Sequence, residues 1–488
     1  MPEILVGGQN GTQVIMDAAM GNRHGMISGA TGTGKTITLQ ILAEGFSKIG
    51  VPVFLADIKG DLSGITVPGQ PHQKISERIQ QIGIANYQPR GNPAIFWDIF
   101  AKTGHPVRTT ISEMGPLLLS NLLELNDTQT GVLYSCFKIA DDNGLLLLDL
   151  KDLRAMLRWM GDESKELQTE YGNISDASLG AIQRQLLVLE EQGAELFFGE
   201  PAIQLEDFCK TDFSGNGVIS ILDATELTTK SPRLYATFLL WLLSDLFEKL
   251  PEVGDSDRPK LVLFFDEAHL LFDQAPKVLV DKIEQIVRLI RSKGVGVYFI
   301  SQSPLDIPED ILGQLGLKIQ HALRAYTPKD QQVIKSVAAT FRSNPKIDTE
   351  AAIQELKTGE ALVSVLNKDG SPAPVERIFI CPPESQLGSI SQQQRDEIMR
   401  RSPFSGRYEQ EIDRESAYEL LKKKAERQDD KAVEERQIKQ PTKTTSRQSS
   451  ERQSVGEALL KSAARSIGST VGRQIIRGIM GSLLGGRR

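Results

Sequence analysis

The segment Met26 to Phe46, MISGATGTGKTITLQILAEGF, contains the spacing G-x-x-x-x-G-K-[ST]. Glycines at this spacing let consecutive backbone N–H groups and the start of a helix point at one anion. The lysine neutralises phosphate oxygens, and the hydroxyl that follows is a ligand for Mg²⁺. The pattern predicts a loop that binds the phosphates of a nucleotide, formed by Gly29, Ala30, Thr31, Gly32, Thr33, Gly34, Lys35 and Thr36.

A second candidate is the apolar run LVLFFDEAH, residues 261–269, which ends in two carboxylates. A strand of this kind places its last side chains at the edge of the sheet where the phosphate loop also lies. We expect Asp266 to hold Mg²⁺ together with Thr36, and Glu267 to polarise the attacking water. Together with the loop, this pair predicts a site for nucleotide hydrolysis.

Two further side chains complete the predicted chemistry. Gln302, at the end of the strand VYFISQSP, has an amide that could bond both the γ-phosphate and the lytic water. Arg324, expected inside the strand QHALRAYTPKD, is the leading candidate to stabilise charge on the γ-phosphoryl group. Arg288 and Arg291 in IVRLIRSKG are alternatives, unless they form a solvated helix face.

The turn ADIKGDL follows the second predicted strand and contains Asp57, Lys59 and Asp61. Its position at the ligand-binding edge of a parallel sheet favours a catalytic or coupling role. A hydrogen-bonded turn explains the same residues nearly as well. The sequence leaves both interpretations open.

The elements that position these residues alternate between strand and helix. HGMIS, VPVFLAD, NGVISILD, PKLVLFFDE, VGVYFISQS and EALVSVL are strand-like and are separated by helical patterns. The texture becomes wholly helical from about residue 103 to 214, which predicts an insertion. We therefore expect an α/β fold with a mostly parallel sheet, helices on both of its faces and a helical insertion.

The amino-acid composition limits the classes of protein to which the chain can belong. The chain has 488 residues with 40% hydrophobic content and three scattered cysteines, which indicates a large core without a disulfide framework or a zinc site. The N-terminus does not resemble a signal peptide, and no apolar stretch has the length of a membrane span. We expect a cytoplasmic protein that is neither secreted nor membrane-spanning.

The charge is distributed unevenly. The net charge is −7, yet the residues from Lys431 onward contain 12 Lys and Arg against 4 Asp and Glu, so the rest of the chain is strongly acidic. An acidic body argues against nonspecific coating of nucleic acid, although a narrow basic channel would not appear in such a sum.

The C-terminal part divides in two. Residues 401–452 are charged and rich in Ser, Thr and Gln, which predicts a disordered linker. In residues 453–488 apolar side chains recur every four positions beside basic ones, which predicts a basic amphipathic helix. Such a helix could contact a membrane surface, an acidic protein partner, copies of itself or its own body. The first domain would then span residues 1–400.

The motifs GATGTGKT, DIKGDL, FFDEAH, GVGVYFISQSP, HALRAYTPKD and GEALVS occur in the order found in HerA/FtsK-type ATPases. The chain resembles that superfamily over about residues 10–385, and within it the bacterial HerA-like family of the YjgR type. Archaeal HerA proteins carry an N-terminal β-barrel before this core. Only 28 residues precede Gly29, so we expect the barrel to be absent.

The resemblance implies a RecA-like P-loop core that binds and hydrolyses ATP with Mg²⁺ in a homo-oligomeric ring, commonly a hexamer. It also implies that the loop, the acidic pair, Gln302 and Arg324 are the site residues, with Arg324 reaching the nucleotide of a neighbour. The first functional hypothesis is therefore an ATP-driven motor that moves or remodels DNA. The second is a nucleotide-gated scaffold whose basic tail recruits a membrane or a protein.

Overall fold

The computed structural model describes residues 2–9, 11–254, 256–273 and 277–438. The chain forms two compact units. Unit 1 comprises residues 1–108, 192–197 and 201–411, and unit 2 comprises residues 109–191, 198–200 and 412–488, each as far as it is described. The predicted C-terminal helix of residues 453–488 lies outside the described residues.

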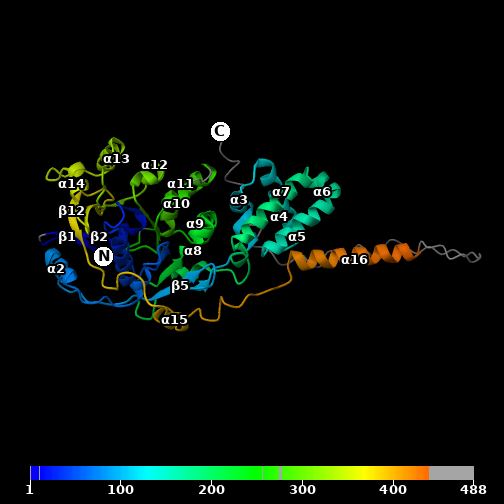
Figure 1. Cartoon of the computed structure of the whole chain (residues 1–488), viewed down its shortest axis with the longest axis horizontal. Helices are drawn as coiled ribbons and strands as arrows, with labels where there is room; N and C mark the ends of the chain where they lie inside the picture. Colours follow the sequence, from blue (N-terminus) through cyan, green and yellow to red (C-terminus); the bar gives the residue numbers. More distant parts are fainter. Residues whose placement is uncertain (1, 10, 255, 274–276, 439–488) are drawn as a thin grey trace, which may run out of the picture. The chain divides into compact units, whose positions relative to one another are not determined.

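The strands of unit 1 form one 12-stranded sheet in the order β2-β1-β12-β11-β10-β3-β9-β8-β4-β7-β5-β6. Figure 1 labels β1, β2, β12 and β5 of this sheet. The strands are β1 (Glu3–Gln9), β2 (Thr12–Asp17), β3 (Gly25–Ser28), β4 (Val53–Asp57), β5 (Ala94–Asp98), β6 (His105–Pro106), β7 (Ile219–Asp223), β8 (Leu261–Phe265), β9 (Val295–Ser301), β10 (Leu317–Gln320), β11 (Glu360–Ser364) and β12 (Glu376–Ile380).

Pairing is parallel from β10 to β6 and antiparallel from β10 through β11, β12 and β1 to β2. The parallel strands read as apolar runs because both of their faces are covered. The prediction of an α/β fold with a mostly parallel sheet is confirmed.

The helices of unit 1 are α1 (Lys35–Lys48), α2 (Gln73–Ile82), α8 (Thr225–Lys230), α9 (Pro232–Lys249), α10 (His269–Phe272), α11 (Lys277–Ile290), α12 (Glu309–Leu312), α13 (Pro328–Ala339), α14 (Thr349–Glu355) and α15 (Gln392–Arg400).

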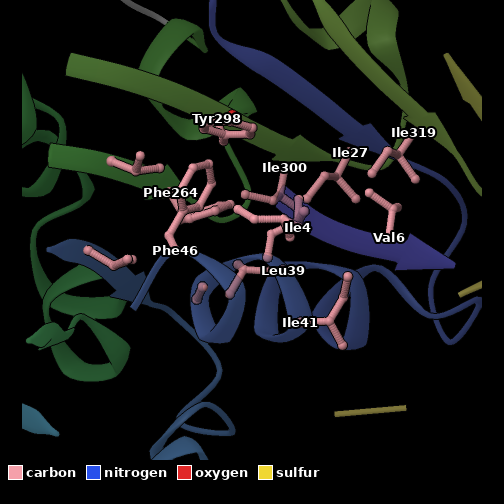
Figure 2. Close-up of a cluster of buried hydrophobic side chains, with 14 of the residues drawn as sticks. Ile4, Val6, Ile27, Leu39, Ile41, Phe46, Phe264, Tyr298, Ile300 and Ile319 are labelled. Atoms are coloured by element: carbon pink, nitrogen blue, oxygen red, sulfur yellow. The ribbon is translucent and has the colours of Figure 1, made fainter. Parts of the chain in front are cut away.

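Helices α1 and α9 cover opposite faces of the sheet. On one face Phe46 of α1 packs against Phe264 of β8 and Tyr298 of β9, with ring centroids 6.4 and 5.8 Å away (Figure 2). Leu55 of β4 belongs to the same cluster on this face. On the other face Phe54, the β4 residue before Leu55, packs against Phe238 of α9. Because successive strand residues point to opposite faces, the sheet lies between two helical layers, as predicted.

Unit 2 is built from helices. They are α3 (Ile111–Leu122), α4 (Asp127–Asp142), α5 (Leu150–Asp162), α6 (Ser164–Tyr171), α7 (Asp176–Glu191) and α16 (Ala417–Ile438). Capping boxes begin α4 at Asn126 and α5 at Asp149, because each side chain accepts a bond from a backbone N–H of the first turn. Five of these helices fall in the segment predicted as a helical insertion, whereas residues 201–214 belong to unit 1.

The segment that begins at residue 401 differs from the expected disordered linker. Phe404 and Tyr408 are buried and stack with Trp97, with ring centroids 5.4 and 5.6 Å from it. Further on, Leu421 of α16 is buried, and Ser416 before it donates to Asp152 of α5. The prediction overlooked these contacts because only a few apolar residues occur in a highly charged sequence. The exact limits of the domains stay a prediction.

Candidate nucleotide-binding site

The predicted phosphate loop joins β3 to α1, as its sequence pattern requires, and α1 begins with Lys35. Gly29 and Gly34 have φ angles of 149° and 121°, a region that favours glycine. A Cβ atom on Gly29 would also lie only 2.5 Å from the Cβ of His321. The glycines therefore provide both the curled backbone and the close packing of the loop.

Lys35 is held by its own loop. Its Nζ donates to the carbonyl oxygens of Gly29 at 2.6 Å and Ala30 at 3.2 Å, and its side chain is buried. Burial lowers the pKa of Lys35, and the positive charge of Lys59 lowers it further. A buried ammonium with carbonyl partners is suited to exchange them for phosphate oxygens, because an anion stabilises the charge more strongly.

The loop, the acidic pair and the Gln302 turn lie at one edge of the sheet. They follow β3, β8 and β9, which are parallel, and β9 lies between the other two. The carboxylates of Glu267 and Asp266 act on Lys35 and offset part of the lowering of its pKa by burial. The backbone of Gly29 also donates to the carbonyl of Gln302 at 3.2 Å. The structure thus brings together three of the predicted parts.

The acidic pair begins directly after β8. Asp266 is 5% exposed, and its Oδ1 accepts a bond from the backbone N–H of Glu267 at 3.0 Å. Burial raises the pKa of Asp266 in spite of the opposing Lys59 ammonium. Glu267 has a φ of 44°, a left-handed conformation that is uncommon outside glycine. Strain of this kind clusters at functional sites, where it fixes the direction of a side chain.

The turn after β4 combines the two interpretations that the sequence left open. Asp57 is buried, and its carboxylate accepts bonds from the backbone N–H groups of Gly60 at 2.8 Å and Leu62 at 3.0 Å. Burial raises the pKa of Asp57 to about 6. Asp57 therefore closes the turn. Lys59 instead reaches Glu267, with Nζ 2.7 Å from Oε1.

Gln302 is exposed immediately after β9. The turn that carries it is fixed by Asp306, whose Oδ2 accepts bonds from the hydroxyl of Ser301 at 2.5 Å and the backbone N–H of Ser303 at 2.9 Å. Because both neighbours of Gln302 are tied to one carboxylate, the turn is well defined while the amide remains accessible.

The expectation that Arg324 lies inside a strand is wrong. β10 ends at Gln320, and the next residues leave the sheet to bond other segments: Ala322 accepts from Ala30 of the phosphate loop at 2.9 Å, and Leu323 donates to Ile353 at 3.3 Å. Arg324 is exposed, and its guanidinium donates to the carbonyl of Gln354 at 2.8 Å. Its side chain thus contacts α14 rather than the acidic pair.

The two alternative arginines, Arg288 and Arg291, have partners outside the candidate site. Arg288 pairs with Glu284 one turn earlier on α11. Arg291 lies close enough to His24, which precedes β3, for its positive charge to act on that histidine. Burial lowers the pKa of His24 most, and the charge of Arg291 lowers it further. Residues before β3 lie at the edge of the sheet opposite to the phosphate loop. Neither arginine joins the candidate site within one chain.

His321 is a contributor that the sequence analysis did not identify. Its Nε2 lies 2.8 Å from the hydroxyl of Thr38 in α1, and its Nδ1 lies 2.9 Å from the carbonyl of Glu360 in β11. Burial lowers the pKa of His321 to about 4, so the ring is neutral at pH 7. The imidazole therefore ties the first helix to the strand region that precedes Arg324. No local sequence pattern predicts this role, because Thr38 lies hundreds of residues away in the chain and Glu360 belongs to another strand.

Within the described residues no group of three or more His, Cys, Asp or Glu side chains is arranged to hold a metal ion. Among the helices that the structure describes, none has both the length and the apolar character needed to cross a membrane.

Two curated relatives were found by sequence. The DNA double-strand break repair helicase HerA of Sulfolobus acidocaldarius is 21% identical over 349 residues, which cover 70% of this chain and 62% of the relative. The probable helicase MJECL08 of Methanocaldococcus jannaschii is 31% identical over 125 residues, which cover 25% of this chain and 22% of the relative. The chain thus spans less than two thirds of either relative.

Solved structures share the fold. The conjugative coupling protein TrwBΔN70 has a TM-score of 0.51 at 15% identity, covering 77% of this chain and 88% of its own. VirB4 of Thermoanaerobacter pseudethanolicus has a TM-score of 0.50 at 17% identity, covering 78% of this chain and 96% of its own. The fold is therefore that of a RecA-like P-loop ATPase. The sequence profile described as Helicase HerA-like C-terminal matches residues 3–488, and with this match over nearly its whole length the chain belongs to that family.

Proposed function

We propose that this protein is a Mg²⁺-dependent ATPase that couples hydrolysis to the movement or remodelling of DNA. The observation that carries the proposal is the meeting of the phosphate loop, the acidic pair and the Gln302 turn at one edge of the parallel sheet. Membership of the HerA-like family supports it, as do two relatives whose names describe helicases.

Each side chain has a distinct task in this proposal. The loop of residues 29–36 binds the phosphates, and Lys35 exchanges its carbonyl partners for phosphate oxygens. Glu267 accepts a proton from the attacking water, and its fixed backbone conformation sets the direction of the carboxylate. Gln302 orients that water and contacts the γ-phosphate. The base of the nucleotide is assigned as adenine from the family alone.

The residues present fit a magnesium ion. Thr36 lies in the first turn of α1, and Asp266 is a nearly buried carboxylate directly after β8. A hydroxyl and one carboxylate are hard oxygen donors of the kind that Mg²⁺ prefers, and the ion usually takes its remaining ligands from phosphate and water. When bound, Mg²⁺ neutralises charge on the phosphates.

Assembly into a ring, a hexamer in the proposed form, gives Arg324 its role. The guanidinium is exposed and held by one carbonyl bond, so little opposes its transfer to an anion on a neighbouring copy. Within one chain it does not join the acidic pair. We therefore assign Arg324 to the nucleotide of the adjacent subunit.

A second function uses the same site. In it the nucleotide gates the assembly of a scaffold, and the basic residues 453–488 bind a protein or a membrane surface. The acidic balance of the rest of the chain favours this alternative, because it opposes broad attraction to nucleic acid. The three free thiols favour a reducing, cytoplasmic location for either function.

The deciding experiment is steady-state ATP hydrolysis with and without duplex or single-stranded DNA, at low and moderate salt. The variant Glu267→Gln serves as the blank. The motor predicts stimulation by DNA that decreases as salt rises, because counterions compete for phosphate contacts. Hydrolysis that DNA does not change at either salt concentration would favour the gated scaffold.

A further inference from the structure

The turn between β4 and the following segment brings a lysine to the acidic pair. β4 pairs in parallel with β8, with Ala56 opposite Phe265. Residues that directly follow the two strands therefore meet at the same edge of the sheet. Lys59 is the third residue after Ala56, and the acidic pair begins one residue after Phe265.

Lys59 contacts both carboxylates of the pair. Its Nζ lies 2.7 Å from Oε1 of Glu267 and 3.5 Å from Oδ2 of Asp266. The side chains of Glu267 and Asp266 are 13% and 7% exposed, whereas that of Lys59 is 38% exposed. A partly exposed ammonium thus pairs with two adjacent, nearly buried carboxylates and offsets part of their charge.

The turn fixes the backbone of Lys59, whereas the side chain is held only through its terminal ammonium. Asp57 accepts bonds from the backbone N–H groups of Gly60 and Leu62, so the turn keeps its shape. Lysine has a flexible four-carbon stem with a compact charge at its end. The ammonium can therefore leave the carboxylates without any rearrangement of the turn.

Electrostatics shows that the contact stabilises a charged lysine. Burial opposes the charged form of Lys59, yet the attraction of Asp266 and Glu267 outweighs it and raises the pKa of the lysine. The same lysine acts on Lys35, whose pKa its charge helps to lower. Lys59 is thus a second cation at the site, directed at the acidic pair.

We infer that Lys59 is a positioning residue that competes with magnesium-bound nucleotide for the carboxylates of Asp266 and Glu267. This inference rests on the proposed function, in which Asp266 holds Mg²⁺ and Glu267 accepts a proton from water. Asp266 cannot direct the same oxygen to an ammonium and a metal ion at full strength, and the Oε1 atom of Glu267 is occupied by the ammonium while the pair is formed. Binding of the metal-nucleotide complex therefore releases Lys59, and its release frees Glu267 for its task.

The test compares wild type with Lys59→Met, which keeps the length of the stem and removes the charge. Affinity for a non-hydrolysable ATP analogue is measured by calorimetry with Mg²⁺ and with EDTA. Removal of the competitor should tighten binding in Mg²⁺ by about fivefold or more, a typical coupling between two sites. Binding in EDTA should change by less than about twofold. Lys59→Arg, which keeps the charge, should stay close to wild type.

A second readout is thermal stability. Without its ammonium, the two adjacent carboxylates lose the cation that contacts them directly, so Lys59→Met should lower the melting temperature of the nucleotide-free protein. The analogue with Mg²⁺ should reduce this deficit. Lys48→Met is the matched control, because Lys48 forms an ion pair at 3.0 Å with Glu384, away from the acidic pair. It should leave the effect of Mg²⁺ unchanged.

Two results would overturn the inference. Equal weakening of binding in Mg²⁺ and in EDTA would assign Lys59 to the phosphates, and unchanged affinity in both would reduce the contact to a structural ion pair. The inference and the proposed role of Glu267 fail separately. If Glu267→Gln hydrolyses ATP at the normal rate, the role of Glu267 as a base is wrong, whereas the Mg²⁺-dependent effect of Lys59→Met on binding is measured without hydrolysis.

Discussion

The phosphate loop and the segment of Arg324 follow neighbouring parallel strands, β3 and β10, and are joined by the backbone bond from Ala30 to Ala322. Their two cations, Lys35 and Arg324, nevertheless differ in burial and in the number of carbonyl groups that hold them. Lys35 is buried and bonded to two carbonyls of its own loop. Arg324 is exposed and bonded to one carbonyl of another element.

This difference is consistent with the proposed division of roles between the two cations. A cation that acts within its own chain is positioned by the loop that surrounds it, so its geometry is complete before any partner arrives. A cation that acts on a neighbour must remain accessible and weakly held. The comparison is therefore compatible with the proposal that Lys35 acts on the nucleotide of its own subunit and Arg324 on that of a neighbour. Substitutions of either cation can test this proposal.

The largest effect is expected for Lys35→Ala. The variant loses the only charge that the phosphate loop itself provides, so affinity for the ATP analogue should fall about a hundredfold or more. Calorimetry measures the change, and Lys48→Ala on the same helix is the control. Affinity close to that of wild type would show that Lys35 does not contact the nucleotide.

Glu267→Gln should separate binding from hydrolysis. The amide keeps the size of the side chain but accepts no proton from water, so the turnover rate should fall by about a thousandfold while nucleotide affinity is retained. Steady-state hydrolysis and calorimetry on the same preparation provide both values. Normal turnover would exclude Glu267 as the base.

Arg324→Ala should reduce turnover by about a hundredfold, as the loss of one transition-state donor does. Mixed with wild type, it should lower activity at mixed interfaces rather than by simple dilution. Arg342→Ala is the matched control, because Arg342 is also exposed and bonded to one carbonyl, that of Pro372 at 2.9 Å. A linear decrease of activity with the fraction of variant would contradict action on a neighbour.

The smallest effect concerns His321, which links the two regions. Its pKa is about 4 in the folded protein and ordinarily 6.5, so between these values the unfolded chain binds more protons. The stability that neutral His321 contributes is therefore present above pH 6.5 and is lost as the pH falls toward 4.

Urea unfolding at pH 7 and pH 5 measures this linkage. Between these values wild type should lose about 2 kcal/mol more stability than His321→Gln. His24, whose pKa burial also lowers to about 4, remains in both proteins and cancels in the comparison. An equal loss in both proteins would mean that His321 is not buried in its neutral form.

Much of the site was predictable because its signals are local. The phosphate loop needs glycines and a lysine at fixed spacing, and the acidic pair needs only a preceding buried strand. Gln302 follows the same rule at the end of β9. In each case a few consecutive residues determine both the element and the chemistry at its end, so the sequence by itself predicts them.

The edges of the fold were less predictable. β1 contains two consecutive glycines, which obscure the strand pattern, yet a Cβ on Gly7 would lie 2.1 Å from the carbonyl oxygen of Phe379 in the paired strand β12. β10 ends earlier than its apolar pattern suggests, because the backbone after Gln320 bonds the phosphate loop. These features depend on partners in distant parts of the chain.

The sequence alone determined the phosphate-loop pattern and the parallel α/β sheet that carries it, since glycine spacing and strand-end carboxylates are properties of short segments. Only the tertiary structure decided that Lys59 meets Glu267, that His321 joins α1 to β11, and that Arg324 donates to the carbonyl of Gln354 in α14. The physical reason is that contacts between distant segments depend on the order and register of the strands, which no local pattern encodes.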